Sequence, residues 1–180
     1  MPLLLLAIFL NGNFDTDLSN AVRRDTSIHL LNTAMGGITT LGDARADAAI
    51  NLGVFFLGND SVARTVKLAT VSWCASGVAT TIIKGAVNRT RPDGSGGSRW
   101  DSSFPSGHTS DYFSIATVYA LKYHRLAIPL YVVGAGVAFS RIYLGKHYAT
   151  DVLGGAALGI LTGWLTVRFE PQLRRIPFLR

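Results

Sequence analysis

Five apolar segments follow one another along this chain of 180 residues, and they restrict its fold more than any other feature. They lie at residues 46–58, 66–83, 109–121, 127–144 and 151–168. Ala, Gly and Ser recur within them, as is typical of helices that pack closely in lipid. No Asn-Gly turn joins two alternating runs, so strands are not indicated. The segments therefore predict an all-α fold.

An apolar start at Met1–Leu10 adds a sixth segment, although about ten residues are too few to span a membrane alone. Only 16% of the residues are charged, against about 25% in a typical soluble domain. We therefore expect one domain over residues 1–180, a six-segment transmembrane helical bundle. Residues 14–31 alternate apolar and charged positions near helical spacing and predict an amphipathic helix at a surface. A soluble helical bundle stays open, because several segments are shorter than about 18 residues.

The net charge of +6 does not indicate a nucleic-acid partner, because the basic residues form no run with interleaved aromatics. Many of them lie at the ends of apolar segments or in the connections between segments. If each segment crosses the membrane once, all of these positions fall on the same side, and basic loops favour the cytoplasmic side. These are Arg64, Lys67, Lys122, His124, Arg125, Arg168, Arg174, Arg175 and Arg180. Cys74 is the single cysteine, so neither an internal disulfide nor a cysteine metal cluster is expected.

A first motif supplies cations: Lys84 is followed, after six residues, by Arg91-Pro92, and Arg141 comes later in the chain. Binding a phosphate away from water needs several cations and amide donors. Arginine can grip two oxygens with its planar fork, whereas lysine acts as a point charge. Any one of these residues alone is equally well a cation at a helix end. Arg89 lies outside the motif, and its sequence position indicates a surface or headgroup contact.

A second motif, Pro105-Ser106-Gly107-His108, stands just before an apolar segment. Free amides at a helix start bind anions, and glycine lets the backbone approach a ligand. Ser106 is either a helix cap or a phosphate ligand. His108 is a candidate general acid, since histidine ionises near neutral pH.

A third motif joins Ser140-Arg141 to His147 and Asp151. The last two are four residues apart and share a face if they lie on one helix. A carboxylate at one imidazole nitrogen would fix the tautomer and leave the other nitrogen free to attack. An exposed ion pair, a helix cap at Asp151 and part of a metal site are the alternatives. We expect Gly145 to break the helix, so that Arg141 and His147 can converge.

The three motifs, in this order and spacing within residues 84–151, resemble those of the type-2 phosphatidic acid phosphatase family. That family also includes vanadium haloperoxidases and bacterial class A acid phosphatases. The resemblance implies that His147 is the nucleophile, Asp151 orients it, and His108 protonates the leaving group. It implies no metal and no cofactor. It assigns phosphate binding to Lys84, Arg91, Ser106, Gly107 and Arg141.

The resemblance also implies a metal-independent lipid phosphatase in a bacterial inner membrane. All three motifs fall on the side opposite the basic connections, so we expect the site to face the periplasm. The candidate substrates are undecaprenyl diphosphate, phosphatidic acid, phosphatidylglycerol phosphate and lipid A phosphate. Arg99 and Trp100 precede the second motif and are candidate headgroup contacts, although Trp100 is equally an interfacial anchor. The alternatives are a soluble periplasmic acid phosphatase, a haloperoxidase and a non-enzymatic lipid-binding membrane protein.

Overall fold

The structure, a computed structural model, describes residues 12–23, 29–96 and 98–176, and within these ranges it is helical without strands. The all-α prediction is confirmed. The α-helices are α2 (Gly12–Arg23), α3 (His29–Thr39), α4 (Ala44–Leu57), α5 (Asp60–Val87), α6 (Gly107–Lys122), α7 (Ala127–Tyr143), α8 (Ala149–Arg168) and α9 (Glu170–Leu173). Short 3₁₀ turns lie at η1 (Thr40–Gly42), η2 (Arg99–Asp101) and η3 (His124–Leu126).

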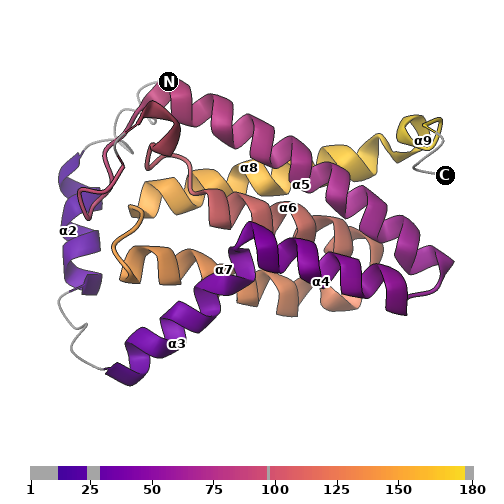
Figure 1. Ribbon diagram of the computed structural model, residues 1–180, viewed down its shortest axis with the longest axis horizontal. Coiled ribbons are helices and arrows are strands. Elements are labelled where there is room, and N and C mark those ends of the chain that lie inside the picture. Colours follow the sequence, from indigo (N-terminus) through magenta and orange to yellow (C-terminus); the bar gives the residue numbers. More distant parts are fainter. Residues whose placement is uncertain (1–11, 24–28, 97, 177–180) are drawn as a thin grey trace.

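Helix α6 is the centre of the bundle and packs against α5, α7 and α8. Helix α3 lies against α7, α4 packs on α5, and α2 lies at one end beside α7 and α8 (Figure 1). The C-terminal end of α5 and the starts of α6 and α8 meet at that same end (Figure 1). The α4–α5 connection and α9 lie at the opposite end, so the fold places the second and third motifs away from them.

A stripe of glycines on α8 sets its close packing on α6. A Cβ added at Gly155 would lie 2.6 Å from the carbonyl oxygen of Ser106, and one at Gly159 would lie 2.5 Å from that of Ser110. At Gly163 it would lie 2.7 Å from a side-chain carbon of Thr117. The stripe recurs every four residues and therefore stays on one face of the helix. Only glycine allows this approach, as predicted from the small residues in the apolar segments.

Hydroxyl side chains join α5 to α6. Ser72 donates to the carbonyl of Ser114 (3.0 Å), Ser76 donates to that of Ser110 (3.3 Å), and Thr80 lies 2.8 Å from the hydroxyl of Ser110. All three α5 residues are buried and lie four apart on one face. Polar bonds between helices hold a bundle together where lipid supplies no hydrophobic force.

The outward faces of the bundle carry large apolar side chains. Phe56 is 74% exposed, Ile82 64%, Ile128 78% and Leu153 57%. Helices in lipid are expected to place small and hydroxyl side chains inside the bundle and aliphatic side chains on its outer faces. Three of the described helices are long and apolar enough to cross a membrane: Asp60–Val87, His124–Tyr143 and Ala149–Arg168. The described helices therefore do not reach the predicted count of six.

The predicted amphipathic segment 14–31 corresponds to two described helices. Helix α2 ends at Arg23 and α3 begins at His29. Residues 24–28, the apolar start Met1–Leu10 and Arg180 lie outside the described residues. The predicted break at Gly145 is confirmed, because α7 ends at Tyr143 and Gly145 has a φ of +67°.

Candidate active site

The three motifs converge at one end of the bundle. Lys84 lies in the last turn of α5, His108 in the first turn of α6, Arg141 in the last turn of α7 and Asp151 in the first turn of α8. The charges of Arg91, Asp151 and Arg141 act on Lys84, and those of Arg141, His147 and Arg91 act on His108. The fold thus brings together residues that the sequence holds up to 67 positions apart.

His147 is held in one orientation by the loop before α6. Its side chain is 2% exposed, and its Nδ1 lies 2.8 Å from the carbonyl oxygen of Ser103. A carbonyl oxygen can only accept a hydrogen bond, so Nδ1 carries the proton. In the neutral ring, the other nitrogen, Nε2, then carries the lone pair that a nucleophile requires.

Asp151 is fully buried, and donors surround its carboxylate. Arg89 donates to Oδ1 at 2.8 Å, while the amide of Tyr148 (2.8 Å) and the hydroxyl of Ser103 donate to Oδ2. Oδ2 lies 3.7 Å from Nδ1 of His147, beyond hydrogen-bond distance. The sequence predicted that the carboxylate of Asp151 contacts one nitrogen of the imidazole ring. In the structure, the carbonyl oxygen of Ser103 takes that place at Nδ1. The carboxylate stabilises positive charge on the ring from 3.7 Å instead.

Arg89 is not the surface residue that its sequence position indicated. Its side chain is 17% exposed, and it forms ion pairs with Asp15 and Asp151 at 2.8 Å each. Asn88 takes the left-handed conformation (φ 50°), which ends α5 and turns the chain toward α8. No sequence signal distinguished Arg89 or Ser103, because the partners of their side chains lie 48 or more residues away.

Three cations lie near the buried histidine or its neighbour Asp151. Lys84 donates to the carbonyl of Ser102, and Arg91 pairs with Asp101 at 2.5 Å. Arg141 is 8% exposed and donates through NH1 to Thr39 at 2.9 Å. Its buried Nε has no hydrogen-bond partner among the described residues. An unpaired buried donor beside two further cations is suited to an anion.

The start of α6 forms another side of the candidate site. The Ser106 amide is bonded to the carbonyl of Asp151 (3.0 Å), and the Ser106 hydroxyl accepts a hydrogen bond from Thr109 at 3.0 Å. Ser106 occupies the N-cap position of α6 without a side-chain cap bond. A Cβ added at Gly107 would meet no heavy atom within 4 Å. The backbone at Gly107 therefore borders open space, whereas Ser106 is buried behind it.

Burial favours the neutral form of His147. Burial lowers the pKa of His147 below its ordinary value of 6.5, and Asp151 opposes that shift. Nearby, hydrogen bonds from Lys146 and Ser95 outweigh the partial burial of Asp93 and hold the pKa of that carboxyl well below its usual range. The Lys146–Asp93 pair, at 2.7 Å, fastens the loop after Arg91 to the loop that carries His147.

Arg99 and Trp100 lie in η2 at the rim. Arg99 lines a polar pocket of about 280 Å³ together with Asn88, Thr90 and Ser98. Trp100 is 61% exposed, and one edge of its ring contacts Gly85, where an added Cβ would lie 2.6 Å away. Neither residue contacts the two histidines in the described hydrogen bonds and ion pairs.

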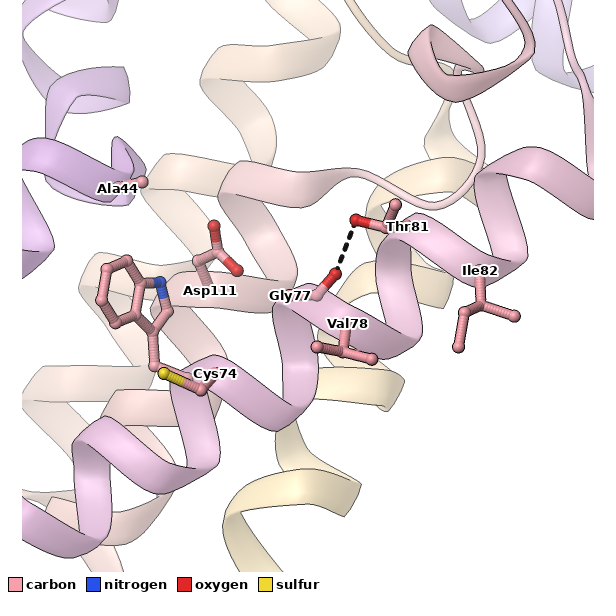
Figure 2. Close-up of a pocket in the computed structure, with 8 residues that line it drawn as sticks. Ala44, Cys74, Gly77, Val78, Thr81, Ile82 and Asp111 are labelled. Atoms are coloured by element: carbon pink, nitrogen blue, oxygen red, sulfur yellow. Dashed lines mark hydrogen bonds between the residues drawn. The ribbon is translucent and has the colours of Figure 1, made fainter.

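A separate apolar pocket of about 560 Å³ opens beside α5 (Figure 2). Cys74, Gly77, Val78, Thr81 and Ile82 line it from α5, and Asp111 faces it from α6. Asp111 follows His108 by three residues and lies on the same face of α6. None of the motif residues lines this pocket, so it is not part of the candidate site.

The described residues contain no group of three or more His, Cys, Asp or Glu that is arranged to hold a metal ion. His147 and Asp151 share their neighbourhood with three cations instead, and a site of that composition favours an anionic ligand.

The comparison with known families shows which family carries these motifs. The profile of the PAP2 superfamily matches residues 65–175. The chain belongs to this superfamily. Its phosphatidylglycerophosphatase B relative from Bacillus subtilis is 31% identical over 163 residues, which cover 81% of this chain and 78% of the relative. The undecaprenyl-diphosphatase BcrC of the same organism is 39% identical over 79 residues, 44% of this chain and 40% of that protein.

The fold agrees with this family. The crystal structure of a transmembrane PAP2 type phosphatidylglycerolphosphate phosphatase from Bacillus subtilis matches with a TM-score of 0.72 and 29% identity. The match covers 97% of this chain and 98% of that one. Together with the apolar outer faces of the helices, it identifies a membrane protein of the PAP2 fold.

Proposed function

We propose that this protein is an integral membrane phosphatase that hydrolyses a phosphate monoester or diphosphate on a lipid. The observation that carries the proposal is the convergence of His147, His108 and Asp151 with three cations at one end of the bundle. PAP2 relatives whose names denote lipid phosphatases support the lipid class. The apolar pocket beside α5 supports it as well, since its wall suits the apolar part of a lipid.

The proposed reaction has two steps. Nε2 of His147 attacks phosphorus, and His108 gives a proton to the departing oxygen as the phosphorus–oxygen bond breaks. Water then attacks the phospho-histidine, His108 accepts its proton, and the P–N bond breaks to release phosphate. Lys84, Arg91 and Arg141, with the backbone amide of Gly107, stabilise the phosphoryl oxygens throughout. The Ser106 amide is already bonded to the carbonyl of Asp151. Asp151 stabilises the ring of His147 while it carries the phosphoryl group.

The proposed setting is a six-span single domain in a bacterial inner membrane, with the site facing outward, on the periplasmic side. Helices α4 and α6 would cross together with the three long helices, although they contain only 14 and 16 residues. The sixth span would come from the apolar start Met1–Leu10, which lies outside the described residues. The basic residues at the α4–α5 and α6–α7 connections favour the cytoplasmic side at the opposite end. The apolar outer faces argue against the soluble acid phosphatase.

The test is a phosphate-release assay on the purified chain with the four candidate lipids named above. His147→Ala should lose several orders of magnitude in turnover while it keeps its fold and its affinity for lipid. Phosphate trapped on the parent should be acid-labile and alkali-stable, and absent from the variant. Turnover of His147→Ala within tenfold of the parent would remove His147 from the nucleophile role. A parent that binds these lipids but releases phosphate from none would favour the non-enzymatic alternative.

A further inference from the structure

Asp15 of α2 is buried at the active-site end although its helix lies at the edge of the bundle. Its side chain is 0% exposed, whereas Asp17 on the same helix is exposed. Its Oδ1 accepts the amide of Thr150 at 3.1 Å, and its Oδ2 accepts the hydroxyl of Thr150 and NH2 of Arg89 (2.8 Å). A carboxylate is costly to bury unless it is fully paired. These three bonds compensate that cost and attach α2 to the start of α8.

Arg89 connects Asp15 to the residue beside the nucleophile. Its NH1 donates to Asp151 Oδ1 at 2.8 Å and to the Thr150 hydroxyl at 2.7 Å, while NH2 bonds Asp15. The guanidinium also lies over the ring of Tyr148, 4.1 Å from its centroid. A planar fork can bridge two carboxylates in one fixed orientation. Arg89 is therefore bound to Asp151, the residue beside the proposed nucleophile. In this position it does not act as a fourth phosphate ligand.

The bridge fixes the carboxylate of Asp151. With Oδ1 held by Arg89, the opposite oxygen receives the Ser103 hydroxyl and the Tyr148 amide and stays 3.7 Å from His147 Nδ1. Rotation of the carboxylate would break at least two of these bonds.

We propose that Asp15 and Arg89 are positioning residues for phosphoryl transfer: Asp15 holds the guanidinium of Arg89 on Asp151, and Arg89 holds that carboxylate beside His147. This inference rests on the proposed function, with His147 as nucleophile. Asp15 lies outside the 65–175 range that matches the superfamily. Helix α2 thus adds a residue to a site whose other members lie within the matched range.

The two residues carry opposite charges, which makes the proposal testable by the pH profile. Removal of the Asp15 charge leaves Arg89 less neutralised and disfavours protonated His147. Removal of the Arg89 charge leaves two carboxylates that favour protonated His147. The charged and titratable groups around His147 are Asp151 of α8, Arg141 of α7, His108 of α6, Lys84 of α5, Asp15 of α2, and Arg89 and Arg91 of the loop after α5.

The experiment compares Asp15→Asn, Arg89→Gln and Arg89→Lys in the full-length chain, with Asp17→Asn as the matched control on α2. We expect Asp15→Asn to lower kcat by about 10- to 100-fold, as for the groups that support metal-bound histidines, with KM within about threefold. The acid limb of kcat/KM should move to lower pH in Asp15→Asn and to higher pH in Arg89→Gln. Substrate ionisation is common to all variants and cancels. Asp17→Asn should match the parent.

Two further measurements separate positioning from a structural role. Arg89→Lys keeps the charge but cannot bridge two carboxylates, so kcat should fall while the acid limb stays in place. Thr150→Val weakens the attachment of α2 without changing a charge and should leave the acid limb unmoved. If Asp15→Asn behaves like Asp17→Asn, or if Asp15→Asn and Arg89→Gln lose only thermal stability with unshifted profiles, the positioning roles are wrong.

The parent assay separates this proposal from the proposed function. A parent that releases phosphate, with His147→Ala inactive and Asp15→Asn unaffected, overturns the positioning roles alone. A parent that releases no phosphate overturns both. If Asp15→Asn does not fold, the kcat of Arg89→Lys is compared with that of the parent instead. An unchanged kcat in Arg89→Lys overturns the proposal.

Discussion

Nδ1 of His147 lies 2.8 Å from the carbonyl oxygen of Ser103, and the hydroxyl of the same serine donates to Asp151. Ser103 is fully buried, and its own amide donates to the carbonyl of Arg89 at 2.7 Å. One residue thereby fixes the tautomer of the histidine, the carboxylate beside it and the chain that carries Arg89. The histidine is consequently buried and oriented before a substrate arrives.

This environment predicts activity that extends to acid pH. Because burial lowers the pKa of His147 below 6.5, the acid limb of kcat/KM should lie below pH 6.5. The folded state also binds fewer protons than the unfolded chain between the two pKa values, so stability should fall as pH drops below about 6.5. Apparent Tm in detergent at pH 7.5 and 5.5 measures this, and His147→Gln should lose less than the parent. Equal losses in both proteins would contradict the assignment.

Activity should persist in excess EDTA, because cations and backbone amides take the place of a metal ion in the proposed mechanism. The measurement is phosphate release before and after chelation, with added magnesium or zinc as the control. Chelation that stops the parent, followed by recovery on addition of either ion, would contradict the mechanism.

Substrate choice should depend on the rim and not on the phosphate site. Arg141→Ala removes charge stabilisation that every substrate shares, so it should depress turnover of all lipids and of a small soluble phosphate ester together, by about 10²- to 10³-fold. Trp100→Ala should reorder the lipids more than it changes hydrolysis of the small ester. The division of roles would be wrong if Trp100→Ala lowered turnover of all substrates equally and Arg141→Ala changed the order of preference among the lipids.

The active-site end should face away from the cytoplasm. In a Cys74→Ser background, single cysteines at Ser98 and His124, both exposed, report the two ends of the bundle. An impermeant thiol reagent should label position 98 in intact cells and position 124 only after permeabilisation. The opposite result would invert the topology and place the substrate in the inner leaflet.

The sequence alone determined the helical class, the approximate ends of five segments and the residues of the three motifs. Apolar runs of fixed length and small-residue content are local properties, and they correspond to α4–α8 within a few residues at most ends. The break at Gly145 was equally local, since a positive φ suits glycine. The number of spans was not determined, because α4 and α6 are too short to be recognised by length.

Only the tertiary structure decided which residues hold His147 and Asp151. Arg89 meets Asp15 across 74 residues, Thr150 meets Asp15 across 135, and Ser103 meets His147 across 44. Each bond is made by an ordinary loop or helix residue with no local pattern. The glycine stripe of α8 lets α6 approach, Asn88 turns the loop back, and α2 lies over the junction. The sequence identified the groups that carry charge and protons, and packing decided which of them touch, because burial and hydrogen-bond partners are properties of the assembled bundle.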